Sequence, residues 1–170
     1  FLGKALSQGY REKVKLATKL PHWSVDIPDD MDSILNAQLG RLKTQQIDYY
    51  LLHALDGRAW DKMEAMGVAD FFSRAKSQGR IINAGFSFHG AEAEFIRIVD
   101  AYDWDFCQIQ YNYLDRKNQA GTKGLKYAAS KDLGVIIMEP LRGGLLGRKP
   151  PPAVSAVWQE ANIQRTPAEW

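Results

Sequence analysis

Two ionisable side chains follow short apolar runs, and their types and spacing suit the polarisation of a carbonyl group. Lys19 ends the run at residues 14–19, and His53 ends the run at residues 47–53. If both runs are parallel strands of a barrel, these ends meet on the face where barrel enzymes react. A buried lysine favours the ionised form of a neighbouring phenol, and a histidine donates hydrogen bonds to carbonyl oxygens. From these residues alone, the alternative is a surface lysine and a core histidine bonded to the backbone.

The elements that would position these residues are strands alternating with helices. Apolar runs indicate strands at residues 14–19, 47–53, 80–87, 106–112 and 135–139. Apolar residues at helical spacing predict helices at 31–43, 68–78, 91–102 and 121–132, a short one around Trp60, and a last one beginning near Ala153. This alternation is typical of parallel strands with helices packed outside them.

The number of strands and the two ends of the chain bear on the fold class. Five strands do not close an eight-stranded barrel but would complete a doubly wound sheet. No glycine-rich phosphate motif follows the first strand, where doubly wound nucleotide-binding proteins carry it. The chain opens on a helix-like pattern at residues 1–10 and closes on a helix start at 166–170. We therefore expect an α/β fold, an incomplete (β/α)8 TIM barrel of about five parallel strands with outer helices. Residues 1–170 would form one barrel domain truncated at both ends.

Composition argues against several classes of protein. The 170 residues are 45% hydrophobic and 25% charged, which is ordinary for a soluble domain. A net charge of +2 with scattered Lys and Arg argues against a nucleic-acid partner. No apolar run approaches the roughly 20 residues that cross a bilayer, so no membrane association is expected. The single cysteine, Cys107, permits no internal disulfide, which favours the cytoplasm, and we expect it to fill a strand rather than act as a nucleophile. No metal site is expected.

Several short motifs together resemble the aldo/keto reductase family. They lie at residues 17–20, 47–53, 85–87, 108–112 and 140–144, in the family's order and across nearly the whole chain. The resemblance implies a (β/α)8 barrel that binds NADPH in extended form without a Rossmann domain. It also implies a catalytic tetrad of Asp, Tyr, Lys and His. Lys19 matches the lysine and His53 the histidine, so the resemblance favours the catalytic interpretation of both.

The resemblance implies a reaction as well. An aldo/keto reductase reduces a small-molecule aldehyde or ketone to an alcohol by hydride transfer from the nicotinamide. The tyrosine would protonate the carbonyl oxygen, Lys19 would lower the pKa of that tyrosine, and His53 would orient the carbonyl. The family's Asp and Tyr precede the position of Phe1, so we expect residues 1–170 by themselves to be inactive.

The resemblance also implies which residues contact the cofactor. Ser87 and Gln108 match the residues that contact the nicotinamide carboxamide. Met138 stands where many members place an aromatic ring that stacks on the nicotinamide, and it can pack there without stacking. Phe88 replaces the usual Asn, so one carboxamide contact is in doubt. The alternative for Ser87, Gln108 and Met138 is that they fill the barrel interior.

Two further regions complete the predicted site. Leu141 and Gly143 lie in the loop that passes the pyrophosphate, where small residues let the backbone approach phosphate, and Arg142 could add charge. Trp23 resembles the aromatic residue that many members place over the substrate. The alternative for Trp23 is a loop side chain that covers exposed apolar surface.

Other interpretations remain open from the sequence. The chain could be a non-catalytic cofactor-binding or regulatory subunit built on the same barrel. It could also be an unrelated barrel enzyme that uses Lys19 as a Schiff-base amine. Residues 138–144 and 166–170 resemble a branch with a C-terminal ferredoxin-like extension, but the clustered cysteines of such an extension are absent from residues 1–170. The sequence predicts neither the identity of the carbonyl substrate, nor NADP over NAD, nor an oligomeric state.

Overall fold

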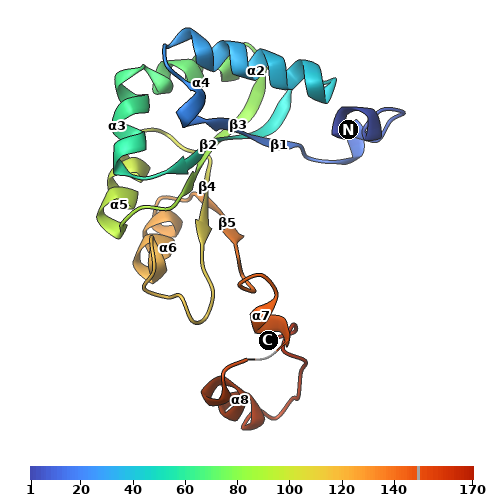
Figure 1. Cartoon of the computed structure of the whole chain (residues 1–170), viewed down its shortest axis with the longest axis vertical. Coiled ribbons are helices and arrows are strands. Elements are labelled where there is room, and N and C mark those ends of the chain that lie inside the picture. Colours follow the sequence, from blue (N-terminus) through green and yellow to red (C-terminus); the bar gives the residue numbers. More distant parts are fainter. Residues whose placement is uncertain (149) are drawn as a thin grey trace.

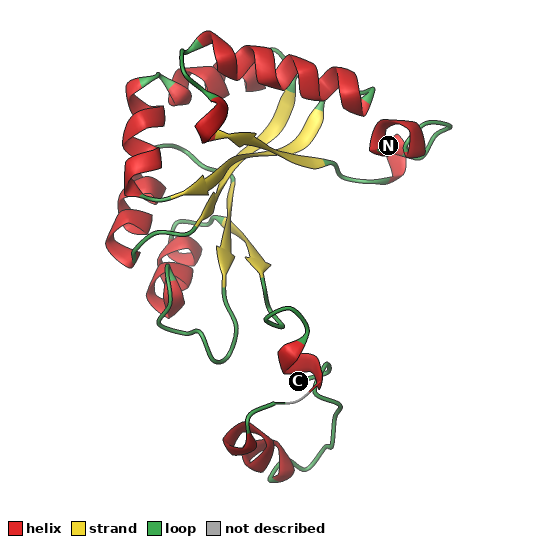
Figure 2. Cartoon of the chain, viewed as in Figure 1, coloured by secondary structure: helices red, strands yellow, loops and turns green. Residues whose placement is uncertain are grey.

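The strands form one parallel sheet in chain order. The computed structural model describes residues 1–148 and 150–170. Within these residues, five strands pair in the order β1-β2-β3-β4-β5, all parallel (Figures 1 and 2). They are β1 (Ala17–Pro21), β2 (Ile47–Leu55), β3 (Ile81–Phe88), β4 (Phe106–Gln110) and β5 (Gly134–Met138). The sheet is an arc of a (β/α)8 barrel, so the predicted fold class is confirmed.

The longer helices cover the outer face of this arc (Figure 2). They are α2 (Asp29–Leu42), α3 (Gly57–Ala65), α4 (Val68–Ser77), α5 (Glu92–Asp100) and α6 (Gly121–Ser130). Asp56 caps α3, because its side chain accepts a hydrogen bond from the backbone N–H of Ala59 at 2.8 Å. α5 begins with Glu92 and Glu94, whose charges suit the positive end of the helix dipole.

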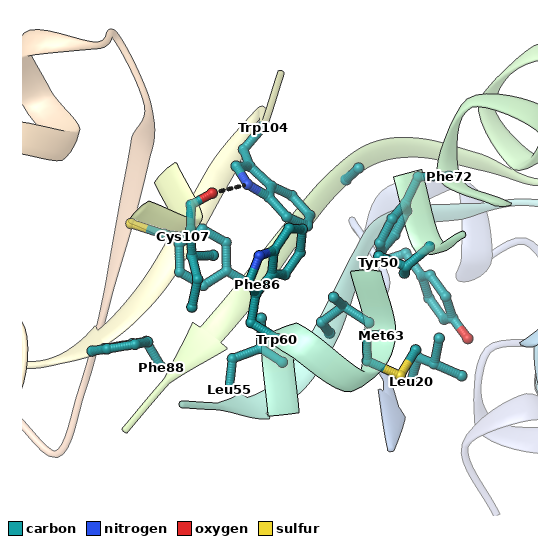
Figure 3. Close-up of a cluster of buried hydrophobic side chains, with 14 of the residues drawn as sticks. Leu20, Tyr50, Leu55, Trp60, Met63, Phe72, Phe86, Phe88, Trp104 and Cys107 are labelled. Atoms are coloured by element: carbon teal, nitrogen blue, oxygen red, sulfur yellow. Dashed lines mark hydrogen bonds between the residues drawn. The ribbon is translucent and has the colours of Figure 1, made fainter. Parts of the chain in front are cut away.

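The main hydrophobic core lies between the outer face of the sheet and these helices. Strand alternation sends every second side chain outward, and Leu20, Tyr50 and Phe86 are each fully buried there. Figure 3 shows how Trp60 and Trp104 join this cluster, with Trp104 Nε1 donating a 2.8 Å hydrogen bond to Ile98 O. Burying each large side chain contributes about 1.5–3 kcal/mol, so this layer supplies much of the stability.

Cys107 belongs to the same core (Figure 3). It is fully buried on the outer face of β4, and burial raises the pKa of its thiol to about 12. A thiol that stays protonated is a poor nucleophile. Its environment agrees with the expected role of Cys107 as strand filler.

The inner face of the sheet divides into an aromatic floor and a polar rim. The ring of Phe106 lies over Gly85, where an added Cβ would come within 2.6 Å of Phe106 O. Tyr49 meets the same ring edge-on, with centroids 5.2 Å apart. Lys19, His53 and Gln108 lie on this face nearer the carboxyl ends of the strands. Tyr49 and Phe106 therefore fill the inner face toward the amino ends of the strands, and the polar residues lie nearer the carboxyl ends, where barrel enzymes react.

Several element boundaries differ from the sequence-based expectation. The first strand begins at Ala17 rather than at residue 14, because Asp48 Oδ2 accepts a hydrogen bond from the Leu16 backbone N–H at 2.9 Å and holds the preceding segment against β2. The helix expected at 31–43 begins two residues earlier, and Asp30 lies within its first turn. The Asp30 carboxylate accepts hydrogen bonds from the backbone N–H groups of Asp26 and Ile27. The fourth strand ends at Gln110 instead of residue 112.

The remaining elements are short and lie toward the two termini. They are α1 (Leu2–Ala5), the 3₁₀ helices η1 (Arg11–Lys13) and η2 (His22–Ser24), α7 (Leu145–Arg148) and α8 (Pro152–Gln159). Beyond β5 the chain runs away from the sheet (Figure 1). Trp158 of α8 stacks on Trp170 at a centroid distance of 5.6 Å and meets Tyr113 at 5.9 Å. No helix in the described residues has the length and apolar character to cross a membrane.

Candidate active site

The sheet brings Lys19 and His53 to one place, as the sequence predicts. β1 and β2 pair with Lys19 opposite Leu51 and Pro21 opposite His53, so both ionisable residues lie on the inner face. Together they line an open hollow of about 350 Å³, which Ala17, Thr18 and Leu51 complete. The carboxyl ends of adjacent strands therefore supply a shared reaction face.

Lys19 reaches across the inner face to β4. Its Nζ donates a 2.6 Å hydrogen bond to Gln108 Oε1, which lies 89 residues away along the chain. Within the described residues, Lys19 forms no salt bridge with a carboxylate. Burial lowers the pKa of Lys19 below its ordinary value. Among the described residues, the charge of Lys19 is therefore met by the neutral amide of Gln108 and not by a carboxylate.

The surroundings of His53 lower its pKa and so favour its neutral form. Burial is the main cause of its lowered pKa, and the charge of Lys19 lowers it further, followed by His89 and His22. A neutral imidazole has one N–H donor and one acceptor nitrogen. His53 can therefore donate a hydrogen bond to an oxygen in the hollow without adding a second charge beside Lys19.

Trp23 lies beside His53 at the edge of the hollow. Their ring centroids are 4.9 Å apart, and 55% of Trp23 remains exposed. The 3₁₀ helix η2 that carries Trp23 is tied to α3, because Lys62 Nζ donates a 3.1 Å hydrogen bond to His22 O. This position suits the predicted substrate contact, which stays a prediction.

Ser87 is fully buried, and its hydroxyl group is bonded to the backbone of β2. It accepts a 2.8 Å hydrogen bond from Ala54 N and donates at 3.4 Å to Leu52 O. The pairing of β2 with β3 shifts register between Leu52 and Leu55, and Ala54 has a positive φ of 55°. Ser87 thus stabilises the irregular strand end that carries His53. Its predicted carboxamide contact would have to share this hydroxyl.

Gln108 and Met138 line the later part of the inner face. Gln108 pairs with Ser87 on one side and Ile136 on the other, and Met138 pairs with Gln110 at the end of β5. Gln108 Oε1 is occupied by Lys19, whereas its Nε2 donates no hydrogen bond within the described residues. This amide N–H₂ group is the polar donor that a carboxamide oxygen would require.

Phe88 does not face this wall. It is fully buried in the outer core, and its ring meets that of Phe95 at a centroid distance of 5.1 Å. A carboxamide contact at this position would need a side chain that points inward. The aromatic residue at position 88 therefore serves the packing of α5 against β3.

The loop after β5 is exposed and has an unusual backbone. Leu141 is 40% exposed, and Gly143 and Gly144 have φ angles of 66° and 92°. An added Cβ on Gly143 would meet nothing within 4 Å. The positive φ, rather than crowding, explains the glycine. The loop therefore presents open backbone, as a phosphate-binding role would require.

A polar cluster that the sequence did not predict follows β4. Asp115 Oδ2 accepts hydrogen bonds from Gln110 Nε2 at 3.0 Å and from Asn112 Nδ2 at 2.8 Å, and it lies 3.4 Å from Arg142 Nε. The Asn-x-x-Asp spacing after a strand was the available signal, because an Asn at that position folds the following backbone into a turn. The partner in the loop after β5 gives no such signal.

A larger surface hollow lies elsewhere, between the N-terminal ends of α5 and α6. It has a volume of about 720 Å³ and is lined by Glu92, Leu114, Arg116, Lys117, Thr122 and Lys123. Its charges are exposed, and Lys123 pairs with Glu92 at 3.2 Å. We place the active site at the smaller hollow because Lys19 and His53, two half-buried groups with shifted pKa values, lie together there. The described residues contain no cluster of three or more His, Cys, Asp or Glu side chains able to hold a metal ion.

The fold and this site define an α/β-barrel protein with its ionisable groups at the carboxyl ends of adjacent strands. Residues 1–164 match the aldo/keto reductase family, and the chain belongs to that family.

Sequence and structure comparisons identify several relatives. The chain is 33% identical over 171 residues to the uncharacterized oxidoreductase YrpG of Bacillus subtilis (strain 168). This match covers 87% of the chain and 49% of YrpG, so the chain spans about half the length of this curated relative.

Solved structures share the fold. The apo form of the aldo-keto reductase AKR11C1 from Bacillus halodurans superposes with a TM-score of 0.76 at 23% identity, covering 99% of this chain and 58% of that one. The aldo/keto reductase from Klebsiella pneumoniae in complex with NADP and acetate has a TM-score of 0.62 at 21% identity, covering 95% of this chain and 52% of that one. At these identities the likeness concerns the fold.

Proposed function

We propose that the protein is an oxidoreductase that reduces aldehydes or ketones to alcohols with NADPH. The single observation that carries this proposal is that the half-buried side chains of Lys19 and His53 line one hollow at the carboxyl ends of adjacent strands. Family membership and the oxidoreductase name of its relative support the same reaction class.

The residues present fit a nicotinamide cofactor. Gln108 lies on the inner face, its Nε2 has no hydrogen-bond acceptor among the described residues, and it would donate to the carboxamide oxygen. Met138 would pack against the ring, and Leu141 and Gly143 would pass the pyrophosphate with exposed backbone. Ser87 would contribute only by sharing its hydroxyl. When bound, NADPH supplies the hydride, and the protein supplies position and electrostatics. A solved relative is described in complex with NADP, which also favours this cofactor.

The side chains in and beside the hollow would each have a separate role in the reduction of the carbonyl group. His53 would donate its N–H to the carbonyl oxygen and orient it, because a neutral imidazole keeps one donor available. Lys19 would lower the pKa of a neighbouring phenol by favouring its ionised form, so that the phenol gives up its proton to the oxygen more readily. Trp23 would cover the substrate and reduce its contact with water.

Turnover with a carbonyl substrate tests this proposal. A purified full-length protein that includes the family's Asp and Tyr should oxidise NADPH in the presence of a panel of aldehydes and ketones. His53→Ala should lower kcat by about 10²-fold, as expected for loss of one positioned donor, while NADPH affinity stays unchanged. Lys13→Ala is the control, because Lys13 is exposed, does not line the hollow and does not contribute to the shifted pKa of His53.

Two other outcomes would replace the proposal. NADPH binding without turnover on any carbonyl would favour the non-catalytic cofactor-binding subunit. Trapping of a substrate on Lys19 by borohydride, with no response to NADPH, would favour Schiff-base chemistry. The expectation that residues 1–170 alone are inactive is tested in the same assay.

A further inference from the structure

The loop after β5 holds two non-glycine residues in a conformation that L-amino acids avoid. Glu139 has a φ of 54° and Arg142 a φ of 47°, and Gly143 and Gly144 follow with positive φ as well. Glycine adopts this region freely, but Glu and Arg rarely do. Such residues persist when the surrounding structure holds them there, and they gather at ligand-binding sites.

One polar pair from another loop contacts both of these residues. Asn112 Nδ2 lies 3.5 Å from Glu139 O, and Asp115 Oδ2 lies 3.4 Å from Arg142 Nε. Asn112 and Asp115 belong to the connection between β4 and α6. The two positions of the loop that most need support are therefore the two that this pair contacts.

The pair is itself built rigidly. Asn112 is 6% exposed, and its side-chain oxygen accepts hydrogen bonds from the backbone N–H groups of Leu114 and Asp115, each at 3.0 Å. Asp115 Oδ2 is fixed in turn by Gln110 Nε2 and Asn112 Nδ2. Asn118 Nδ2 donates to Gln110 Oε1 at 2.6 Å and completes the network. The Asp115 carboxylate is therefore held in place by its own loop and strand, independently of Arg142.

We propose that Asp115 is a positioning residue that holds the loop at residues 139–144 in the form that receives the cofactor's phosphates. The proposal rests on the function proposed above. Gln108, the predicted carboxamide contact, and Asp115 lie seven residues apart on one continuous segment. This segment therefore sets the spacing between the nicotinamide contact and the phosphate loop. Arg142 would therefore have two roles: its ion pair with Asp115 holds the loop, and its charge could also attract phosphate.

The experiment compares Asp115→Ala and Asp115→Asn with the wild-type protein. Hydrogen exchange should become faster at the loop amides that bond within the turn, such as Gly144 to Leu141 O and Leu146 to Leu141 O. KM for NADPH should rise about tenfold in Asp115→Ala, the effect expected for loss of a charge-assisted contact, with kcat nearly unchanged. Asp115→Asn should show a smaller rise, because an amide oxygen still accepts one hydrogen bond.

Asp103→Asn is the matched control. Asp103 is exposed and precedes β4 at the opposite end of the strand. It should change neither the exchange rates of the loop nor KM. Asp115→Asn keeps the size of the side chain, so it covers the case in which Asp115→Ala does not fold.

The outcomes separate this inference from the proposed function. If the wild-type protein does not bind NADPH, the proposed function is wrong, and the role proposed for Asp115 is wrong as well. If the wild-type protein binds NADPH and both Asp115 variants keep its KM, only the role of Asp115 is overturned. Equal loss of kcat and affinity in both variants, with no change in loop exchange, would also overturn it.

Discussion

Asp48, near the amino end of β2, and Lys19, toward the carboxyl end of β1, differ in whether the described residues pair their charge with an opposite one. Asp48 is 5% exposed and has a partner for each oxygen: Arg11 Nη2 lies 2.8 Å from Oδ2, and Lys15 Nζ lies 3.3 Å from Oδ1. Burial by itself would raise the Asp48 pKa, but the Leu16 backbone N–H and these two cations outweigh it and lower the pKa.

Among the described residues, the carboxyl end offers no such compensation. Lys19 bonds to the neutral amide of Gln108, and its pKa is lowered by burial. Within the described residues no carboxylate offsets this charge. A fully paired charge contributes to stability, whereas an unpaired one is maintained at a cost and is available to act on a ligand. The contrast agrees with barrel enzymes, in which the amino end serves stability and the carboxyl end serves catalysis.

Among the changes that test the contrast between Asp48 and Lys19, we expect Lys19→Met to have the largest effect. We expect kcat to fall by about 10³-fold, because proton transfer to the carbonyl loses its electrostatic support. The free energy of unfolding should stay the same or increase, because the half-buried cation is removed. Steady-state kinetics and urea unfolding measure the two quantities. Lys13→Met, a change at an exposed lysine, is the control, and similar losses in both variants would remove Lys19 from the catalytic role.

The opposite pattern is expected for Asp48→Asn. The free energy of unfolding should fall by about 2–3 kcal/mol, because the buried carboxylate loses its charge-assisted hydrogen bonds. The kcat of the protein that remains folded should be unchanged. Urea unfolding with Asp103→Asn as the control measures the loss. A large fall in kcat without a fall in stability would mean that the amino end also takes part in catalysis.

The pH dependence of this stability term has a definite sign. Because the Asp48 pKa is lowered in the folded state, its contribution is present above the ordinary pKa of an aspartate, about 3.9. The contribution is lost as the pH falls through the lower, folded value. The difference in unfolding free energy between wild type and Asp48→Asn should therefore shrink in acid. A difference that grows toward low pH would contradict the pairing of Asp48 with Arg11 and Lys15.

At the carboxyl end, His53 should titrate below the ordinary histidine range. The lowered pKa means that the folded state binds fewer protons than the unfolded state, so stability declines as the pH falls below about 6.5. Because the charge of Lys19 also lowers this pKa, Lys19→Met should raise it. Titration of the His53 ring by NMR measures both values. An unchanged His53 pKa in Lys19→Met would show that the two residues do not share the hollow.

The smallest effect is expected for Trp23→Ala. Trp23 is half exposed and meets His53 through its ring alone, so we expect a rise of a few-fold in KM for the carbonyl substrate and little change in kcat. The free energy of unfolding should stay within about 0.5 kcal/mol of the wild-type value, because the side chain is largely in solvent. An unchanged KM would favour the alternative that Trp23 only covers apolar surface.

Much of the fold follows from local pattern. The apolar runs around Lys19, His53 and Gln108 were predicted to be strands, and the structure confirms this. Their alternation with helices predicted that the strands are parallel, as observed. Boundaries were wrong where one side chain bonded to a distant backbone, as Asp48 does at Leu16. The helix expected over residues 1–10 is confined to α1, because the chain turns at Gln8 and Gly9, which both have positive φ.

The candidate site was predictable in part. Strand periodicity alone places Lys19 and His53 on one face, because side chains alternate along a strand. The sequence by itself thus determined which face carries the ionisable residues and which carries the core. Tertiary structure decided that Lys19 bonds to Gln108, that the Ser87 hydroxyl is bonded to the backbone of β2, and that Asp115 reaches Arg142. These partners lie on different elements, and their contact depends on strand register and loop course, which no local spacing of residue types encodes.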